Sequence, residues 1–279
     1  MKNKLKVLLA TDFSRNSRIS LHNLKFIKEK IQLNISFIHV IASFWKDWLV
    51  SGMYKKEAAQ RLKSWQQEII GESKPKNLFV GIGNRADTIL SKAQELKVDL
   101  IVLGGKDTQS KGRYKSGTTV ENVVRNAKQS VLVCKNEKIS KILCGIDGSA
   151  SSAKALEWAI ELAHRFNVKL TILFVISKIS TSALGMEEKE ILQDEANIEK
   201  ENTYKIEQFL KKFDFSTLDV DKQYRWGVPA HVLLDAAEDF EYDMIVIGAK
   251  GHSRLHHVLM GSTAEKILRF SPCSLMVVR

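Results

Sequence analysis

The stretch Asp243–Arg279, DMIVIGAKGHSRLHHVLMGSTAEKILRFSPCSLMVVR, decides the fold of this chain. Met244–Ile247 is apolar and partly β-branched, which predicts a buried strand. A polar, cationic loop with three glycines follows, and Ser262 opens a segment with the apolar spacing of a helix. Glycines let backbone N–H groups approach an anion, and a helix N-terminus attracts negative charge. The stretch therefore predicts a phosphate-binding loop between a strand and a helix.

The chain repeats itself after about half its length. Strands alternate with helices in each half, which predicts βαβ units and a parallel sheet. Matching positions keep an offset of 135 residues early in the repeat and 144 later: Asp12 with Asp147, Val40 with Val175, Gly104 with Gly248, and Gly117 with Gly261. Nine extra residues therefore fall in the second crossover of the second half, which holds the charge-rich amphipathic segment Glu187–Phe213. We infer an internal duplication with domains 1–137 and 138–279.

Composition limits the classes of partner. With 279 residues and 44% hydrophobic residues, the chain has enough apolar material for two packed cores. The formal net charge of +11 favours anionic partners. Lys and Arg are scattered among Asp and Glu, so no basic stripe marks a nucleic acid or a membrane surface, and neither is expected as a partner.

The cysteines and the apolar runs indicate the compartment. Cys134, Cys144 and Cys273 lie in or beside predicted buried strands and share no metal-ligand spacing, so they are expected to be reduced thiols. Reduced cysteines suit the cytoplasm. No apolar run resembles a signal peptide or approaches the roughly 20 residues needed to span a bilayer. A soluble, cytoplasmic protein is expected.

The spacing of the glycines is specific: Gly248, two residues, Gly251, nine residues, Gly261, then Ser262 and Thr263. This pattern resembles the ATP-binding signature of the universal stress protein family, and the order of elements around it is similar too. Because the pattern occurs twice, the resemblance covers nearly the whole chain and points to tandem, two-domain members.

The resemblance implies a fold. Two tandem doubly wound α/β domains are expected, each an open five-stranded parallel sheet in the order 3-2-1-4-5 with helices on both faces. In this family the last strands of two copies pair antiparallel. Ser130–Lys135 and Ser274–Arg279 are therefore expected to join the halves as an intramolecular pseudo-dimer, and the chain could dimerise once more.

The topology also predicts where a ligand binds. In an open parallel sheet it binds beyond the carboxyl ends of the strands where the strand order reverses, here between the first and fourth strands. By resemblance the ligand is ATP or AMP, with Mg²⁺ possible beside ATP. The predicted nucleotide site consists of Gly145, Ile146, Asp147, Val175, Ile247, Gly248, Gly251, His252, Arg254, Gly261, Ser262 and Thr263.

Simpler interpretations of these residues stay open. Ser262 and Glu265 have the spacing of a capping box, in which Ser262 would satisfy the first amides of its helix. Asp147 could cap the first helix of its half. The loop also contains three histidines, His252, His256 and His257. They have no cysteine or acidic ligand nearby, so no metal site is predicted.

The first copy departs from the pattern. Gly104 is followed by Asp107 where the second copy has a glycine, and a carboxylate there would oppose a phosphate unless neighbouring basic residues compensate. The degenerate site comprises Asp12, Val40, Gly104, Asp107, Gly117 and Thr118. We expect it to bind nucleotide weakly or not at all. The alternative is a different anionic ligand, attracted by Lys106, Lys111, Arg113 and Lys115.

Three classes of function follow. The leading hypothesis is a cytoplasmic stress-response protein that binds ATP or AMP and acts as a nucleotide-dependent regulator. A slow Mg²⁺-dependent ATPase is the second, although there is no evident general base, and no nucleophile positioned by one, unless a loop histidine serves. The third is a nucleotide-independent scaffold that binds an unknown protein through the Trp45–Trp65 region or the long charged helix.

Overall fold

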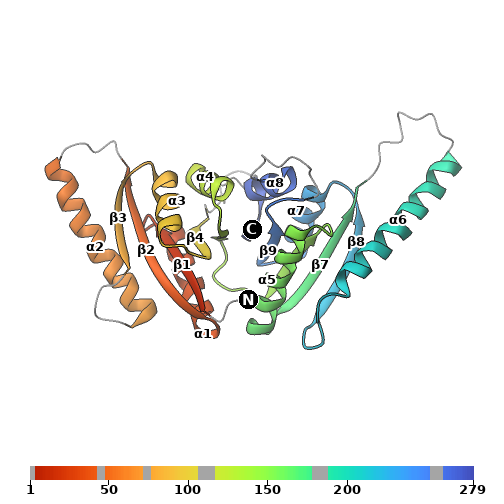
Figure 1. Ribbon diagram of the computed structural model, residues 1–279, viewed down its shortest axis with the longest axis horizontal. Coiled ribbons are helices and arrows are strands. Elements are labelled where there is room, and N and C mark those ends of the chain that lie inside the picture. Colours follow the sequence, from red (N-terminus) through yellow and green to blue (C-terminus); the bar gives the residue numbers. More distant parts are fainter. Residues whose placement is uncertain (1–3, 43–47, 72–76, 106–116, 178–187, 252–259) are drawn as a thin grey trace.

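The computed structural model describes residues 4–42, 48–71, 77–105, 117–177, 188–251 and 260–279 (Figure 1). The first half contains β1 (Lys4–Thr11), α1 (Arg15–Lys30), β2 (Gln32–Ala42), α2 (Trp48–Ile70), β3 (Leu78–Gly83), α3 (Arg85–Glu95), β4 (Leu100–Gly104), α4 (Thr118–Asn126) and β5 (Ser130–Cys134). The second half contains β6 (Lys141–Ile146), α5 (Ala150–Phe166), β7 (Lys169–Ile176), α6 (Glu188–Leu210), β8 (Val220–Trp226), α7 (Pro229–Asp239), β9 (Met244–Gly248), α8 (Ser262–Phe270) and β10 (Ser274–Val278).

All these strands belong to one ten-stranded sheet, in the order β3-β2-β1-β4-β5-β10-β9-β6-β7-β8. Counted within each half, the order is 3-2-1-4-5, and every pairing inside a half is parallel. β5 and β10 pair antiparallel, with Leu132 opposite Met276. The predicted α/β fold class, the strand order and the pairing of the two halves are confirmed.

The central strands carry apolar side chains to both faces of the sheet, as parallel strands covered by helices require, whereas the edge strand β8 presents Val220, Tyr224 and Trp226 to one face only. In β6, Ile142 packs in the core layer with α1, α2, α5 and α6, whereas the next residue, Leu143, packs in the opposite layer with α3, α4, α7 and α8. Three-layer packing of this kind buries the sheet and leaves the ends of the strands accessible. Figure 1 shows the two halves lying side by side, with α4 and α8 adjacent at the centre.

Contacts beyond β5 and β10 hold the halves together. Phe26 of α1 and Phe166 of α5 pack with ring centroids 4.8 Å apart. Lys135 Nζ donates to the Ser271 carbonyl at 2.6 Å, and Arg279 Nη2 donates to the Val124 carbonyl at 2.6 Å. The seam between the halves is therefore packed and hydrogen-bonded along its length.

The two crossover helices, α2 and α6, each span 23 residues. The extra residues of the second half therefore lie in the connections that flank α6 and not in the helix itself. Of the first-half tryptophans, Trp65 is buried and packs its edge against Phe13, with ring centroids 5.5 Å apart. Trp45 and the side chain of Trp48 lie outside the described residues.

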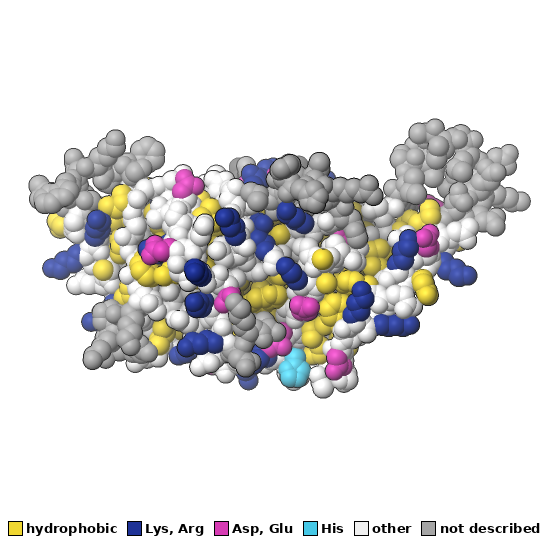
Figure 2. Space-filling view, in the orientation of Figure 1, with side chains coloured by type: hydrophobic (Ala, Val, Ile, Leu, Met, Phe, Trp, Pro, Cys, Tyr) yellow, Lys and Arg dark blue, Asp and Glu magenta, His cyan; other side chains and the backbone are white. Residues whose placement is uncertain are grey.

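The distribution of basic side chains and the composition of the helices can be compared with the expectation that neither a nucleic acid nor a membrane is a partner. Figure 2 shows Lys and Arg side chains spread over the visible face among Asp and Glu, without a continuous basic stripe on that face. Within the part of the chain that the structure describes, no helix is both long enough and apolar enough to cross a membrane.

Candidate functional site

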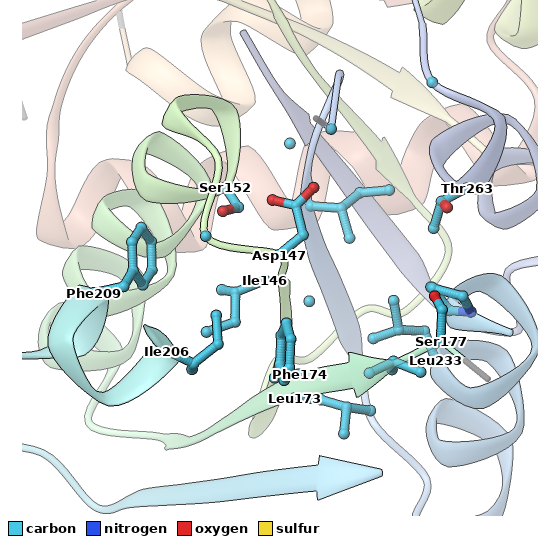
Figure 3. Close-up of a pocket in the computed structure, with 18 of the residues that line it drawn as sticks. Ile146, Asp147, Ser152, Leu173, Phe174, Ser177, Ile206, Phe209, Leu233 and Thr263 are labelled. Atoms are coloured by element: carbon cyan, nitrogen blue, oxygen red, sulfur yellow. The ribbon is translucent and has the colours of Figure 1, made fainter. Parts of the chain in front are cut away.

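A cavity of about 950 Å³ lies at the carboxyl ends of β6, β7 and β9 (Figure 3). β6 lies between β9 and β7 in the sheet, so this is where the strand order of the second half reverses. Ten predicted residues line it: Gly145, Ile146, Asp147, Val175, Ile247, Gly248, Gly251, Gly261, Ser262 and Thr263. His252 and Arg254 lie outside the described residues. Sequence-distant positions thus converge on one crevice.

The turn from β6 into α5 places Asp147 in this cavity. Gly148 has a φ of 82°, and Ser149 caps α5 by accepting a hydrogen bond from the Ser152 N–H at 3.2 Å. Asp147 precedes this cap and accepts from the Ser149 N–H at 2.9 Å. The alternative that Asp147 is the helix cap is therefore wrong, because the Ser149 hydroxyl has that role. Figure 3 shows Ile206 and Thr263 on opposite sides of Asp147.

Gly251 lies against the same carboxylate. A Cβ atom added at Gly251 would come within 2.7 Å of Asp147 Oδ2, which is closer than real Cβ contacts allow. The glycine loop and the carboxylate therefore meet inside the crevice, as the topology predicts. Space that a side chain would fill stays open to a ligand.

The start of α8 does not form the capping box that Ser262 and Glu265 could have made. Gly261 is the N-cap, with no side-chain cap bond, and Ser262 is the first helical residue. A capping box at Ser262 is therefore wrong, because the serine stands one position too late, and Glu265 instead accepts a hydrogen bond from Arg125 at 2.6 Å. The first intrahelical bond runs from the Glu265 N–H to the Gly261 carbonyl at 2.9 Å.

The first-turn amides of α8 have no acceptor within their own helix and lie at the cavity. The N–H groups of Ser262, Thr263 and Ala264 precede that first bond, so helix geometry supplies them with no intrahelical acceptor. All three residues line the cavity. The loop ends are held to each other, because Gly261 N–H donates to the Ala249 carbonyl at 2.8 Å, and to β10, because Ala249 N–H donates to the Val278 carbonyl at 2.8 Å. A helix N-terminus presented to a cavity in this way favours an anion.

Gly248 was expected to be glycine so that the backbone can approach a phosphate, but its contact with α5 already requires a glycine. A Cβ there would lie 2.8 Å from the backbone carbon of Ser151 in α5. Gly145 is similar, since its Cβ would meet Leu233 Cδ1 at 2.8 Å. Both residues line the cavity, but close packing of helices against the strand ends is what excludes a side chain.

Helix α6 contributes residues that the sequence did not assign to the site. Ile206 and Phe209 are 4% and 8% exposed and line the cavity beside Phe174. The polar residues of α6 that also line it are Asn202, Lys205 and Gln208, and Lys212 lines it from the turn after the helix. The apolar positions Ile198, Ile206 and Phe209 carry a helical spacing that could have identified the inward face.

The first half has its own cavity, of about 620 Å³, at the ends of β1 and β4. Five predicted residues line it, namely Asp12, Val40, Gly104, Gly117 and Thr118, whereas Asp107 lies outside the described residues. Burial tends to raise the pKa of Asp12, but hydrogen bonds from Ser14 and Ser17 outweigh it and leave that pKa below its usual value. Ser17 Oγ donates to Asp12 Oδ1 at 2.6 Å.

No metal centre is evident in the described ranges, where no cluster of three or more His, Cys, Asp or Glu side chains could hold an ion. The three loop histidines, His252, His256 and His257, lie outside those ranges.

The fold and its crevices define a class: two doubly wound α/β repeats joined into one sheet, each with a ligand crevice where its strand order reverses. The model of the universal stress protein family matches residues 5–135 and again residues 138–279. The chain therefore belongs to the universal stress protein family, and the family is present in tandem.

Individual relatives agree. Universal stress protein YxiE of Bacillus subtilis (strain 168) is 32% identical over 146 residues, which is 50% of this chain and 99% of that protein. The crystal structure of a universal stress protein from Archaeoglobus fulgidus DSM 4304 has a TM-score of 0.70 at 20% identity and covers 98% of both chains. A functionally unknown protein, PA1789 of Pseudomonas aeruginosa PAO1, has a TM-score of 0.71 at 15% identity over 98% of this chain and 92% of that one. At these identities the two structures show a shared fold.

Proposed function

We propose that the second half of the chain binds an adenine nucleotide, ATP or AMP. The observation that carries this proposal is the cavity of about 950 Å³ in which the first-turn residues of α8 and the Asp147 carboxylate line a common space. A volume of this size is at the upper end of the range for small-molecule sites. The site residues are those predicted from the sequence, together with the inward face of α6.

The parts of the crevice suit the parts of a nucleotide. The phosphates would lie against Ser262 and Thr263, whose amides and hydroxyls are donors at a helix N-terminus. The base and ribose would lie near Asp147 and Val175, at the ends of β6 and β7. Mg²⁺ beside ATP would be held by the phosphates and Asp147, and it would supply screening of their charge.

The output that we propose is a change in the surface offered to a protein partner, in a cytoplasmic stress-response regulator. Cys134, Cys144 and Cys273 are buried and free, which is typical of a reducing compartment. We propose that the first half binds nucleotide weakly or not at all.

The first test is chemical. The purified full chain is denatured, and the released small molecules are identified by mass spectrometry. Release of an adenine nucleotide in molar proportion to protein supports the proposal. If no nucleotide is released and calorimetric titration with ATP and AMP also shows no heat of binding, the proposal is wrong and a nucleotide-independent scaffold replaces it.

The second test is a matched pair of variants. Thr263→Val removes a hydroxyl at the start of α8 and should weaken nucleotide binding about tenfold, the cost of one hydrogen bond to a charged group. Thr119→Val makes the same change at the corresponding position of α4 and should leave the affinity unchanged. Equal losses in both variants would contradict assignment of the site to the second half. Phosphate release that is lost in Asp147→Ala would indicate a slow ATPase.

A further inference from the structure

The turn after the first strand differs between the halves in an unusual way. Gly148 follows Asp147 with a φ of 82°, and its counterpart, Phe13, follows Asp12 with a φ of 61°. A positive φ suits glycine and is strained for a residue with a bulky side chain. Retention of Phe13 in this conformation calls for a compensating role of its ring.

The ring of Phe13 is held on three sides. It stacks on His39 with centroids 4.6 Å apart, meets the edge of Trp65 at 5.5 Å, and lies 4.5 Å from the guanidinium carbon of Arg61. The Arg61 contact is a cation–π geometry. Phe13 is therefore a fixed wall, built from β2 and α2 as well as from its own turn.

The crevice of the first half is divided into two cavities, and Phe13 lines one of them. In the second half one cavity reaches from the glycine loop past Gly148 to the inward face of α6. In the first half two cavities occupy the matching places, one of about 620 Å³ at the glycine positions and one of about 300 Å³ under α2. Phe13 lines the smaller one, whereas Asp12, Val40 and Arg85 line both.

Cationic groups from separate elements line the smaller cavity. Arg61 comes from α2 and Arg85 from the start of α3. The residue that corresponds to Arg85 in the second half is Pro229, and the one that corresponds to His39 is Phe174, so these polar groups belong to the first half alone. Burial lowers the pKa of His39 and outweighs the raising effects of the Thr11 carbonyl and of Asp12, and both guanidinium groups lower it further.

Apart from the contact of Arg61 with the Phe13 ring, the two arginines are weakly paired with carboxylates. Among the residues that the structure describes, Arg85 has no ion-pair partner, and Arg61 lies 3.9 Å from Glu57, at the outer limit of an ion pair. Both Arg61 and Glu57 side chains are more than half exposed in that pair. The Asp12 carboxylate, by contrast, already accepts hydrogen bonds from Ser14 and Ser17.

We propose that this smaller cavity binds a small hydroxylated anion, a hydroxycarboxylate or a sugar phosphate, between Arg61 and Arg85. The planar guanidinium fork matches carboxylate and phosphate oxygens. The acceptors on the wall, Asp12 and Glu57, would receive the hydroxyl groups of the ligand, and the Phe13 ring closes the side that is open in the second half. A volume of about 300 Å³ admits a molecule of this size and is about a third of the volume of the second-half cavity.

The test uses the full chain and two probes, glycerol 3-phosphate and malate, with uncharged glycerol as a blank. Calorimetric titration is run with and without saturating ATP, so that it does not depend on nucleotide binding by the second half. Binding of either probe supports the proposal, and the tighter probe identifies the anionic group. No heat with either probe up to about 10 mM, a concentration that reveals even weak complexes, would overturn it.

Variants locate the binding. Arg61→Gln and Arg85→Gln should each weaken the tighter probe about tenfold, since each removes a charge-assisted contact. Arg18→Gln is the matched control, because Arg18 pairs with Glu68 at 2.9 Å and does not line the cavity. Phe13→Gly, which installs the second-half residue, should also weaken binding while circular dichroism shows a folded chain. Unchanged affinity in both cavity-arginine variants, or an equal loss in Arg18→Gln, would refute the site.

Discussion

Arg125 of α4 donates from Nη2 to Oε1 of Glu265 in α8 across 2.6 Å, and so joins the two halves beside their crevices. The relationship is only partly symmetric. The reverse pair, Arg269 with Glu121, is 3.9 Å apart, while Arg269 also reaches Glu265 at 3.2 Å. Both helices begin at a cavity, so this network connects the segments that would respond first to a ligand in either half.

The Arg125–Glu265 pair should show measurable coupling. A double-mutant cycle with Arg125→Ala and Glu265→Ala, followed by urea unfolding, should give a coupling free energy of about 1 kcal/mol. The partly exposed Arg18–Glu68 pair within the first half is the control and should give less. A coupling energy of zero for Arg125 and Glu265 would show that the short contact does not stabilise the seam.

Serine substitutions at the caps of α4 and α8 should separate stability from binding. Gly261→Ser supplies a hydroxyl for the first amides of α8, so it should raise the free energy of unfolding by a few tenths of a kcal/mol. The same hydroxyl competes with the phosphates, so ATP affinity should fall about tenfold. Thermal melts and calorimetric titration measure the two effects.

Gly117→Ser is the counterpart in the first half, where an added Cβ meets nothing within 4 Å. It should stabilise by a similar amount and leave ATP affinity unchanged. If Gly261→Ser stabilised the chain and also kept full affinity, the amides of α8 would not be the phosphate donors.

The stability of the chain should depend on pH through Asp12. Its pKa is lower in the folded chain than the usual value near 3.9, so its contribution is present above that value and disappears as the pH falls through the folded pKa. Urea unfolding from pH 6 downward should show parent and Asp12→Asn curves that converge in acid. Ser17→Ala should raise the Asp12 pKa, which NMR titration measures. Parallel curves would contradict this assignment.

Alanine at Gly248 should destabilise the fold by about 1 to 3 kcal/mol, the usual cost of overpacking. The reason is the approach of the new Cβ to the backbone of Ser151. Gly104→Ala should behave alike, because its Cβ would lie 2.6 Å from the backbone carbon of Asn16. Gly52→Ala is the control, since an added Cβ at that position of α2 meets nothing within 4 Å. A Gly248→Ala chain with unchanged unfolding and reduced ligand affinity would restore a role in ligand access.

Much of the crevice could be predicted because it depends on topology. The repeat offsets matched Asp12 with Asp147 and Gly104 with Gly248, and the strand order then brought distant positions to the same end of the sheet. The strand order and the antiparallel pairing of β5 with β10 were expected from the resemblance to the family. Matching the two repeats needed only the order of elements and the spacing of small residues.

The remaining features depend on contacts that no local pattern encodes. The sequence predicted the long helix α6 but treated it as a partner surface, because the face that meets the cavity is set by packing on β7. The reason for Gly248 lies in α5, almost a hundred residues away in the chain. The capping box at Ser262 failed by a single position, since boundary residues depend on the loop that precedes them.

The antiparallel seam of β5 and β10 has a consequence for how the protein can change over time. Two separate chains that associate through this seam would carry identical crevices, and their association would weaken on dilution. With both partners on one polypeptide, assembly is intramolecular and unfolding should not depend on protein concentration. One half can therefore change its ligand through mutation while the other half keeps its original ligand.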